Sequence, residues 1–127
     1  MKTNPVGWFE IYVQDMHRAK AFYEAVFATT LEKLPTPDLE MWSFPMGEGD
    51  CGTVPGAPGA LVHMPGCQSG GGGTLVYFSC EDCATEQARA AANGGHVFKE
   101  KFSIGQYGFI SLVTDTEGNM IGLHSQQ

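Results

Sequence analysis

The sequence predicts an α+β fold built from two modules of the same βαβββ order. The chain has 127 residues, which is the size of one domain with one core. A β-type segment followed by a helix-type segment occurs twice. Sliding one half of the chain by 67 residues places Asp15 on Asp82 and Ala21 on Ala88. This repeat predicts two similar modules that share a curved sheet, with the helices on its outer face.

The first module is expected at about residues 6–64. Residues 7–13 are β-branched and aromatic and end just before Asp15, as expected for a strand followed by a helix cap. Apolar residues then recur at steps of three and four, which predicts a helix from about Met16 to Phe27. Three short strands follow at 30–33, 40–45 and 60–64, separated by turn-forming residues. A loop is expected at 47–59.

The second module, at about residues 74–125, repeats this order. A strand is expected at 74–80, and Asp82 is positioned to cap a helix that reaches about Asn93. The three remaining strands are expected at 96–102, 107–114 and 120–124. Residues 65–73, between the modules, are rich in glycine and have the composition of a flexible linker.

The charge balance excludes several classes of partner. The chain has seven basic and fourteen acidic residues, a formal charge of -7, and its basic residues are scattered. Nucleic acid and anionic membranes need clustered cations, so neither is an expected partner. No stretch approaches about 18 consecutive apolar residues, and the polar start lacks a signal-peptide core, so we expect a soluble cytoplasmic protein. The four cysteines are too irregularly spaced for a disulfide framework and are expected as free thiols.

Two stretches carry a family resemblance that covers essentially the whole chain. Phe-Glu-Ile-Tyr-Val-Gln-Asp at 9–15, with the helix behind it, resembles the opening of the glyoxalase / bleomycin-resistance / extradiol-dioxygenase superfamily, also called vicinal oxygen chelate proteins. Residues 114–123 resemble its closing strand, usually Asp-Pro-x-Gly-Asn followed by an apolar-Glu-Leu triplet. The resemblance implies sheets that curl round a cleft for a small molecule, commonly completed in a homodimer.

The resemblance also implies where a metal would bind. Metal-dependent members hold a divalent ion with one residue from the first strand and one from the last strand of each module. The corresponding residues here are Trp8, Leu75, Gly122 and, in the first module, a residue near Ala60. None of these offers an imidazole, carboxylate or thiolate donor. We therefore expect no metal cofactor, and Ni, Zn, Fe or Mn would need a relocated site.

Side chains alternate along a strand, so Glu10, Tyr77 and His124 should face the same way as those four positions. A carboxylate in an apolar strand is costly to bury without a partner or a raised pKa. Glu10 therefore either bonds a neighbouring donor and serves the fold, or serves function as a general base. In the second case Tyr77 or His124 would be the acid or orienting group, although His124, close to the C-terminus, could equally be solvated.

A second candidate for chemistry is the C-x-x-C of Cys80 and Cys83. Cys83 would begin a helix, whose N-terminal amides favour a thiolate. The alternative is that both are small packing residues.

Three functions follow from these observations. The first is a metal-independent small-molecule binder of the bleomycin-resistance type, with Glu10 anchoring a cationic or hydrogen-bond-donating ligand. Its expected binding residues are Trp8, Glu10, Met41, Trp42, Leu75 and Tyr77. The second is a lyase, isomerase or dioxygenase with a relocated metal or acid/base site. The third is an accessory module that works through its dimer surface.

Overall fold

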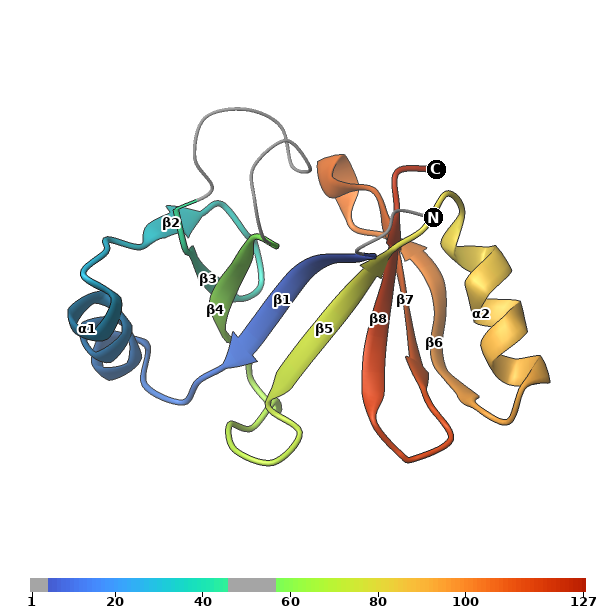
Figure 1. The fold of residues 1–127 in the computed structure, drawn as a ribbon. Helices are drawn as coiled ribbons and strands as arrows, with labels where there is room; N and C mark the ends of the chain where they lie inside the picture. The colour runs from blue at the N-terminus through green and yellow to red at the C-terminus, as the bar shows by residue number, and fades with distance from the viewer. Residues whose placement is uncertain (1–4, 46–56) are drawn as a thin grey trace. The chain divides into compact units, whose positions relative to one another are not determined.

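The computed structural model describes residues 5–45 and 57–127. Two α helices and eight strands in these ranges follow the order βαβββ twice, which confirms the predicted α+β fold class (Figure 1). Most of the loop expected at 47–59 lies outside the described residues, as does Cys51. The chain divides into two compact units, Phe9–Thr74 and the combination of Met1–Trp8 with Leu75–Gln127. No helix in the described ranges has the length and apolar character needed to cross a membrane.

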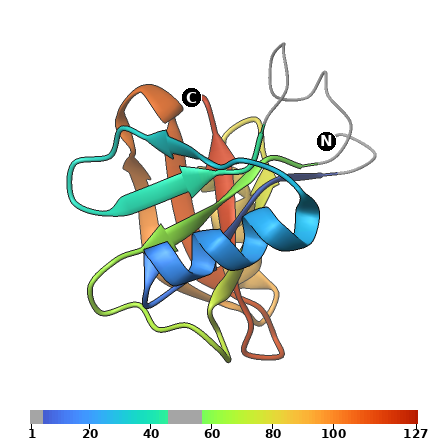
Figure 2. The same cartoon turned by 90° about the vertical axis from the view of Figure 1, so that its left-hand side faces the viewer.

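The unit Phe9–Thr74 has strands in the order β2-β3-β4-β1, with β1 and β4 parallel and the other pairs antiparallel. Helix α1 lies along one face of these strands (Figure 2). The elements are β1 (Val6–Tyr12, of which Val6–Trp8 groups with the other unit), α1 (Met16–Phe27), β2 (Glu32–Leu34), β3 (Glu40–Ser43) and β4 (Gly59–His63).

The core of this unit lies between α1 and the strands. Val13, Met16, Leu31 and Leu61 are buried together, and Ile11 packs against them. Because side chains alternate on a strand, the odd-numbered residues of β1 face α1, and Glu10 and Tyr12 lie on the opposite face.

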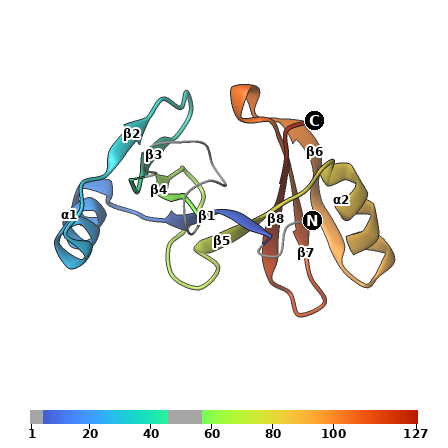
Figure 3. The same ribbon diagram turned by 45° about the horizontal axis from the view of Figure 1, so that its top comes forward.

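The second unit has the strand order β5-β8-β7-β6, again with its first and last strands, β5 and β8, parallel. Helix α2 packs beside β6 and β7 (Figure 3). Its core contains Cys83, Val113 and Leu123, and Phe78 packs against them. Tyr77 therefore lies on the face away from α2. The elements are β5 (Thr74–Ser79), α2 (Cys83–Ala92), β6 (His96–Ser103), β7 (Phe109–Thr114) and β8 (Met120–Ser125).

The glycine-rich stretch between the modules contains hydrogen-bonded turns: the Cys67 amide donates to the Met64 carbonyl at 3.1 Å, and the Gly73 amide donates to the Gly70 carbonyl at 2.8 Å. The Gly73 carbonyl in turn accepts from the Tyr12 amide at 2.7 Å, so this stretch ties down the end of β1. In addition, a short 3-10 turn at Gly105–Tyr107 occupies the start of the strand expected at 107–114.

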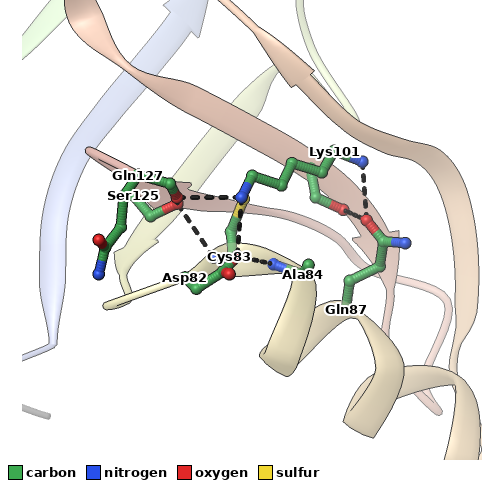
Figure 4. A network of polar contacts seen from close by, with 8 residues as sticks. Asp82, Cys83, Ala84, Gln87, Lys101, Ser125 and Gln127 are labelled. Carbon is green, nitrogen blue, oxygen red and sulfur yellow. Dashed lines mark hydrogen bonds and ion pairs between the residues drawn. The ribbon is translucent and has the colours of Figure 1, made fainter.

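A polar network fixes the start of α2 (Figure 4). Asp82 Oδ1 accepts from the Ala84 amide at 3.0 Å and from Lys101 Nζ, on β6, at 2.8 Å. Ser125 Oγ, on β8, accepts from the Cys83 amide at 3.0 Å and donates to the Gln127 carbonyl at 2.9 Å. The bond from Lys101 and the helix amide hold the pKa of Asp82 below its ordinary value of 3.8. The network thus joins the helix start, β6 and the end of the chain.

We predict that Asp82→Ala lowers the free energy of unfolding at neutral pH, because the helix loses its cap and Lys101 loses its partner. A carboxylate whose pKa is depressed on folding stabilises the fold above pH 3.8, and this contribution disappears as the pH falls through the lower folded pKa. Urea unfolding should therefore separate the variant from the wild type at pH 7 but much less at about pH 2. Asp38→Ala, at an exposed turn, is the control. An equal difference at both pH values would contradict the assigned role.

Candidate functional site

The face of the second unit away from α2 centres on an aromatic ring over a glycine. Tyr77 on β5 pairs in register with Gly122 on β8. A Cβ atom placed on Gly122 would lie 2.2 Å from Cδ1 of Tyr77, so the ring lies directly across this backbone position. Tyr77 is only 6% exposed. The ring thus fills the space into which a side chain at position 122 would project.

Glu10 occupies the equivalent place in the other unit. Each unit contains one parallel strand pair, β1 with β4 and β5 with β8. Just past the end of the first strand of each pair, an equivalent hydrogen bond forms: the Val13 amide donates to the Val62 carbonyl at 2.8 Å, and the Cys80 amide donates to the His124 carbonyl at 2.7 Å. Glu10 precedes Val13 by as many residues as Tyr77 precedes Cys80, so Glu10 and Tyr77 occupy equivalent positions. In the same way Ala60, the register partner of Glu10, corresponds to Gly122.

The four positions at which the resemblance implies metal ligands do not fit a divalent ion. Trp8, Ala60, Leu75 and Gly122 provide an indole, a methyl, an isobutyl and no side chain. None contains the imidazole, carboxylate or thiolate donor that such ions require. Across residues 5–45 and 57–127, no three or more His, Cys, Asp or Glu side chains gather into a group that could hold a metal.

Glu10 forms a short hydrogen bond with a phenol. Tyr12 Oη donates to Glu10 Oε1 at 2.6 Å, and both side chains are partly buried. A bond of this length to a carboxylate is strong and orients it. Residues two apart on a strand share a face, but the sequence gives no signal that the Tyr12 hydroxyl would turn toward Glu10.

The two aromatic and sulfur candidates on β3 lie on opposite faces of the strand. Met41 pairs with Val62, the residue that also pairs with Tyr12, so Met41 shares the face of the Glu10–Tyr12 pair. Trp42 packs against the core under α1. Its Nε1 donates to Glu40 at 2.8 Å, and Lys20 Nζ lies 3.4 Å from its ring centroid. Trp42 therefore holds helix and strand together and stays outside the surface that we propose below.

His124 and Leu75 share the face of Tyr77 within the second unit. His124 is paired in register with Ser79, two residues along from the Tyr77–Gly122 pair. Its Nε2 lies 2.5 Å from the carbonyl oxygen of Tyr107, which joins β8 to the 3-10 turn. Sequence reasoning missed this turn, and the signals for it are two glycines, Gly105 as its first residue and Gly108 directly after it.

Both cysteines of the C-x-x-C pair pack in the core of the second unit. Cys83 is fully buried, with its amide bonded to Ser125 Oγ. Burial raises the pKa of the Cys80 thiol to about 12, and the Glu86 carboxylate and the Cys83 thiol add to the effect. A thiolate at Cys80 is thus strongly disfavoured at neutral pH, in contrast to the lowered pKa of reactive cysteines.

Comparison with known proteins identifies the class. The sequence model of the Glyoxalase/Bleomycin resistance protein/Dioxygenase superfamily matches residues 6–123, and the chain belongs to this superfamily. Among curated proteins it is 27% identical over 120 residues to "Putative glyoxylase CFP32" of Mycobacterium bovis and to the protein of the same name from Mycobacterium tuberculosis. The match covers 92% of this chain and 44% of those proteins, so the chain spans less than half of their length.

Solved structures confirm the fold. Methylmalonyl-CoA epimerase from Mycobacterium tuberculosis superposes with a TM-score of 0.67 at 14% identity, covering 100% of this chain and 93% of the epimerase. A hypothetical protein from Bacillus halodurans gives 0.69 at 13% identity, covering 99% and 96%. Methylmalonyl-CoA epimerase from Streptomyces coelicolor gives 0.65 at 14% identity, covering 98% of each chain. At these identities the likeness concerns the fold alone.

We predict that Gly122→Ala destabilises the protein by about 1–3 kcal/mol, because the new methyl group overlaps the Tyr77 ring. Gly71→Ala is the matched control, since a Cβ there meets nothing within 4 Å. In a Tyr77→Ala background the cost of Gly122→Ala should shrink, which a double-mutant cycle by urea unfolding measures. Equal costs at positions 71 and 122 would show that the ring does not occupy this space.

Proposed function

We propose that this chain is a metal-independent small-molecule binding protein of the bleomycin-resistance type. The observation that carries the proposal is the Glu10–Tyr12 pair, joined at 2.6 Å on the strand face away from α1. In place of a metal, this face offers an oriented carboxylate. A ligand with a cationic or hydrogen-bond-donating group is its natural complement.

The surroundings of the pair favour a ligand that is also apolar. Ala60 and Val62 lie beside Glu10 and Tyr12 in register and are buried, and Met41 continues the same row. A carboxylate next to apolar groups attracts a cation more strongly than one in water. The Met41 thioether adapts to irregular apolar shapes. We therefore assign a planar or apolar organic cation as the ligand class.

The second unit provides an apolar surface at the equivalent place. Leu75 and Tyr77 are buried on the face away from α2, and neither carries a charge. We propose that they form an apolar and aromatic contact surface within their own unit and that His124, held by the Tyr107 carbonyl, supports the adjacent 3-10 turn.

One observation favours a second candidate, an enzyme with an acid/base site. The Tyr12 hydroxyl lies within proton-transfer distance of Glu10, so Glu10 could act as a general base with Tyr12 as its proton partner. In that case Tyr12 would replace Tyr77 and His124 as the acid. A lyase or isomerase of this kind would convert its ligand, whereas a binder releases it unchanged.

Calorimetric titration tests the proposal, with bleomycin A2 and the planar cation ethidium as probes and EDTA present throughout. We expect saturable binding of at least one probe and a loss of about tenfold or more in affinity in Glu10→Gln, which keeps the side-chain shape but removes the charge. Glu100→Gln, an exposed carboxylate on β6, should bind like the wild type. Circular dichroism checks that both variants fold.

Unchanged affinity in Glu10→Gln would remove this carboxylate from the site, and binding of neither probe would contradict the ligand class. Liquid chromatography with mass spectrometry of the recovered probe separates the two candidate functions, since a changed retention time or a changed mass indicates catalysis.

A further inference from the structure

Helix α2 is followed by an asparagine–glycine step. Asn93 comes directly after Ala92, the last residue of the helix, and both Asn93 and Gly94 are exposed. The other two asparagines of the chain precede Pro5 and Met120. Proline has no amide N–H, and the side chain of any residue except glycine crowds its own amide nitrogen. Of the three asparagines, Asn93 is thus the one whose side-chain amide is followed by an unhindered backbone nitrogen.

The bonds that hold Asn93 belong to the last turn of α2. Its Nδ2 donates to the Arg89 carbonyl at 2.8 Å, and its amide donates to the Ala90 carbonyl at 3.2 Å. Opening these bonds costs little free energy, because helix ends fray. Once they are open, the Asn93 side chain can turn toward the Gly94 nitrogen. Gly94, at a φ of 94°, has no side chain that opposes this rotation.

Asn119, in the turn between β7 and β8, is held much more firmly. Its amide donates to Asp115 Oδ1 at 2.9 Å, and its Nδ2 donates to Asp115 Oδ2 at 3.2 Å. Its carbonyl accepts from the Asp115 amide at 2.9 Å. The next residue, Met120, begins β8 and pairs with Thr114. Asn119 is exposed like Asn93, but these bonds oppose the rotation that Asn93 can make.

We propose that Asn93 is a site of hydrolytic deamidation, with water as the co-reactant. The Gly94 nitrogen loses its proton to base and attacks Cγ of Asn93. The new C–N bond closes a succinimide ring, and the bond from Cγ to Nδ2 breaks to release ammonia. Water then opens the ring at Cγ, which gives aspartate, or at the main-chain carbonyl, which gives isoaspartate. The net reaction consumes water and releases ammonia, without oxidation or reduction.

Either product disturbs the end of α2. A carboxylate cannot donate to the Arg89 carbonyl, and it adds a negative charge at the negative end of the helix dipole. Isoaspartate also lengthens the main chain by a methylene group. The following turn is closely packed: the Gly95 amide donates to the Ala90 carbonyl at 2.9 Å, and a Cβ on Gly95 would lie 2.5 Å from the Thr114 carbonyl oxygen. We therefore expect the modified chain to melt roughly 2–6 °C lower.

Peptide mapping by mass spectrometry tests the site, after the folded chain has been kept for roughly two weeks at about 37 °C and about pH 8. We expect amide-to-acid conversion at Asn93 to exceed that at Asn119 by about tenfold or more, and to rise with pH because the attacking nitrogen must lose a proton. Asn119→Gln should leave conversion at Asn93 unchanged. The chain unfolded in urea is the positive control, since its asparagines need no bond to open. An unmodified Asn93 in the folded chain, or equal conversion at the two asparagines, would overturn the proposal.

Asn93→Asp reproduces one product and tests its effect on the helix end. Thermal melts should show a fall of roughly 2–6 °C relative to the wild type. Gln68→Glu adds the same charge at an exposed turn and should melt like the wild type. Asn93→Gln keeps an amide but closes a ring much more slowly, so this variant should retain its melting temperature during the incubation that lowers that of the wild type. Equal losses in Asn93→Gln and the wild type would show that the change arises elsewhere and would overturn the proposal.

Discussion

The contact between the Tyr77 ring and the backbone of Gly122 is the constraint on which the rest of the site depends. Parallel pairing of β5 and β8 brings these two residues side by side. Since the ring occupies the space of a Cβ atom, position 122 accepts glycine and little else. A carboxylate at this position, which the metal-dependent pattern requires, would have to displace a buried tyrosine. A larger side chain at position 122 and the Tyr77 ring in its present position therefore exclude one another.

The unit Phe9–Thr74 has the same strand pairing but different side chains at the equivalent positions. Glu10 lies where Tyr77 lies in the repeat, and its partner Ala60 lies where Gly122 lies. The carboxylate faces away from α1 and is oriented by Tyr12. At this equivalent place one unit therefore has an oriented carboxylate and the other a buried aromatic ring, although both follow the same strand order.

Much of the fold could be predicted because local signals agreed with one another. The cap at Asp15 and the apolar period gave a helix at 16–27, and α1 spans Met16–Phe27. Composition could not show the turn hydrogen bonds within the glycine-rich residues 65–73, because backbone groups of any residue type can make them. In the site, strand alternation placed Glu10 correctly opposite the helix. It could not show that the Tyr12 hydroxyl bonds Glu10 or that Trp42 packs under α1, because both depend on side-chain conformation.

The central claim is that ligand recognition in this chain needs no metal ion, and metal content tests it most directly. The protein should be purified without chelator, analysed for bound metal, and melted with and without Ni²⁺, Zn²⁺, Fe²⁺ and Mn²⁺. The account predicts much less than one ion per chain and no metal-dependent rise in the melting temperature. One tightly bound ion per chain, or a large stabilisation by one of these metals, would contradict it.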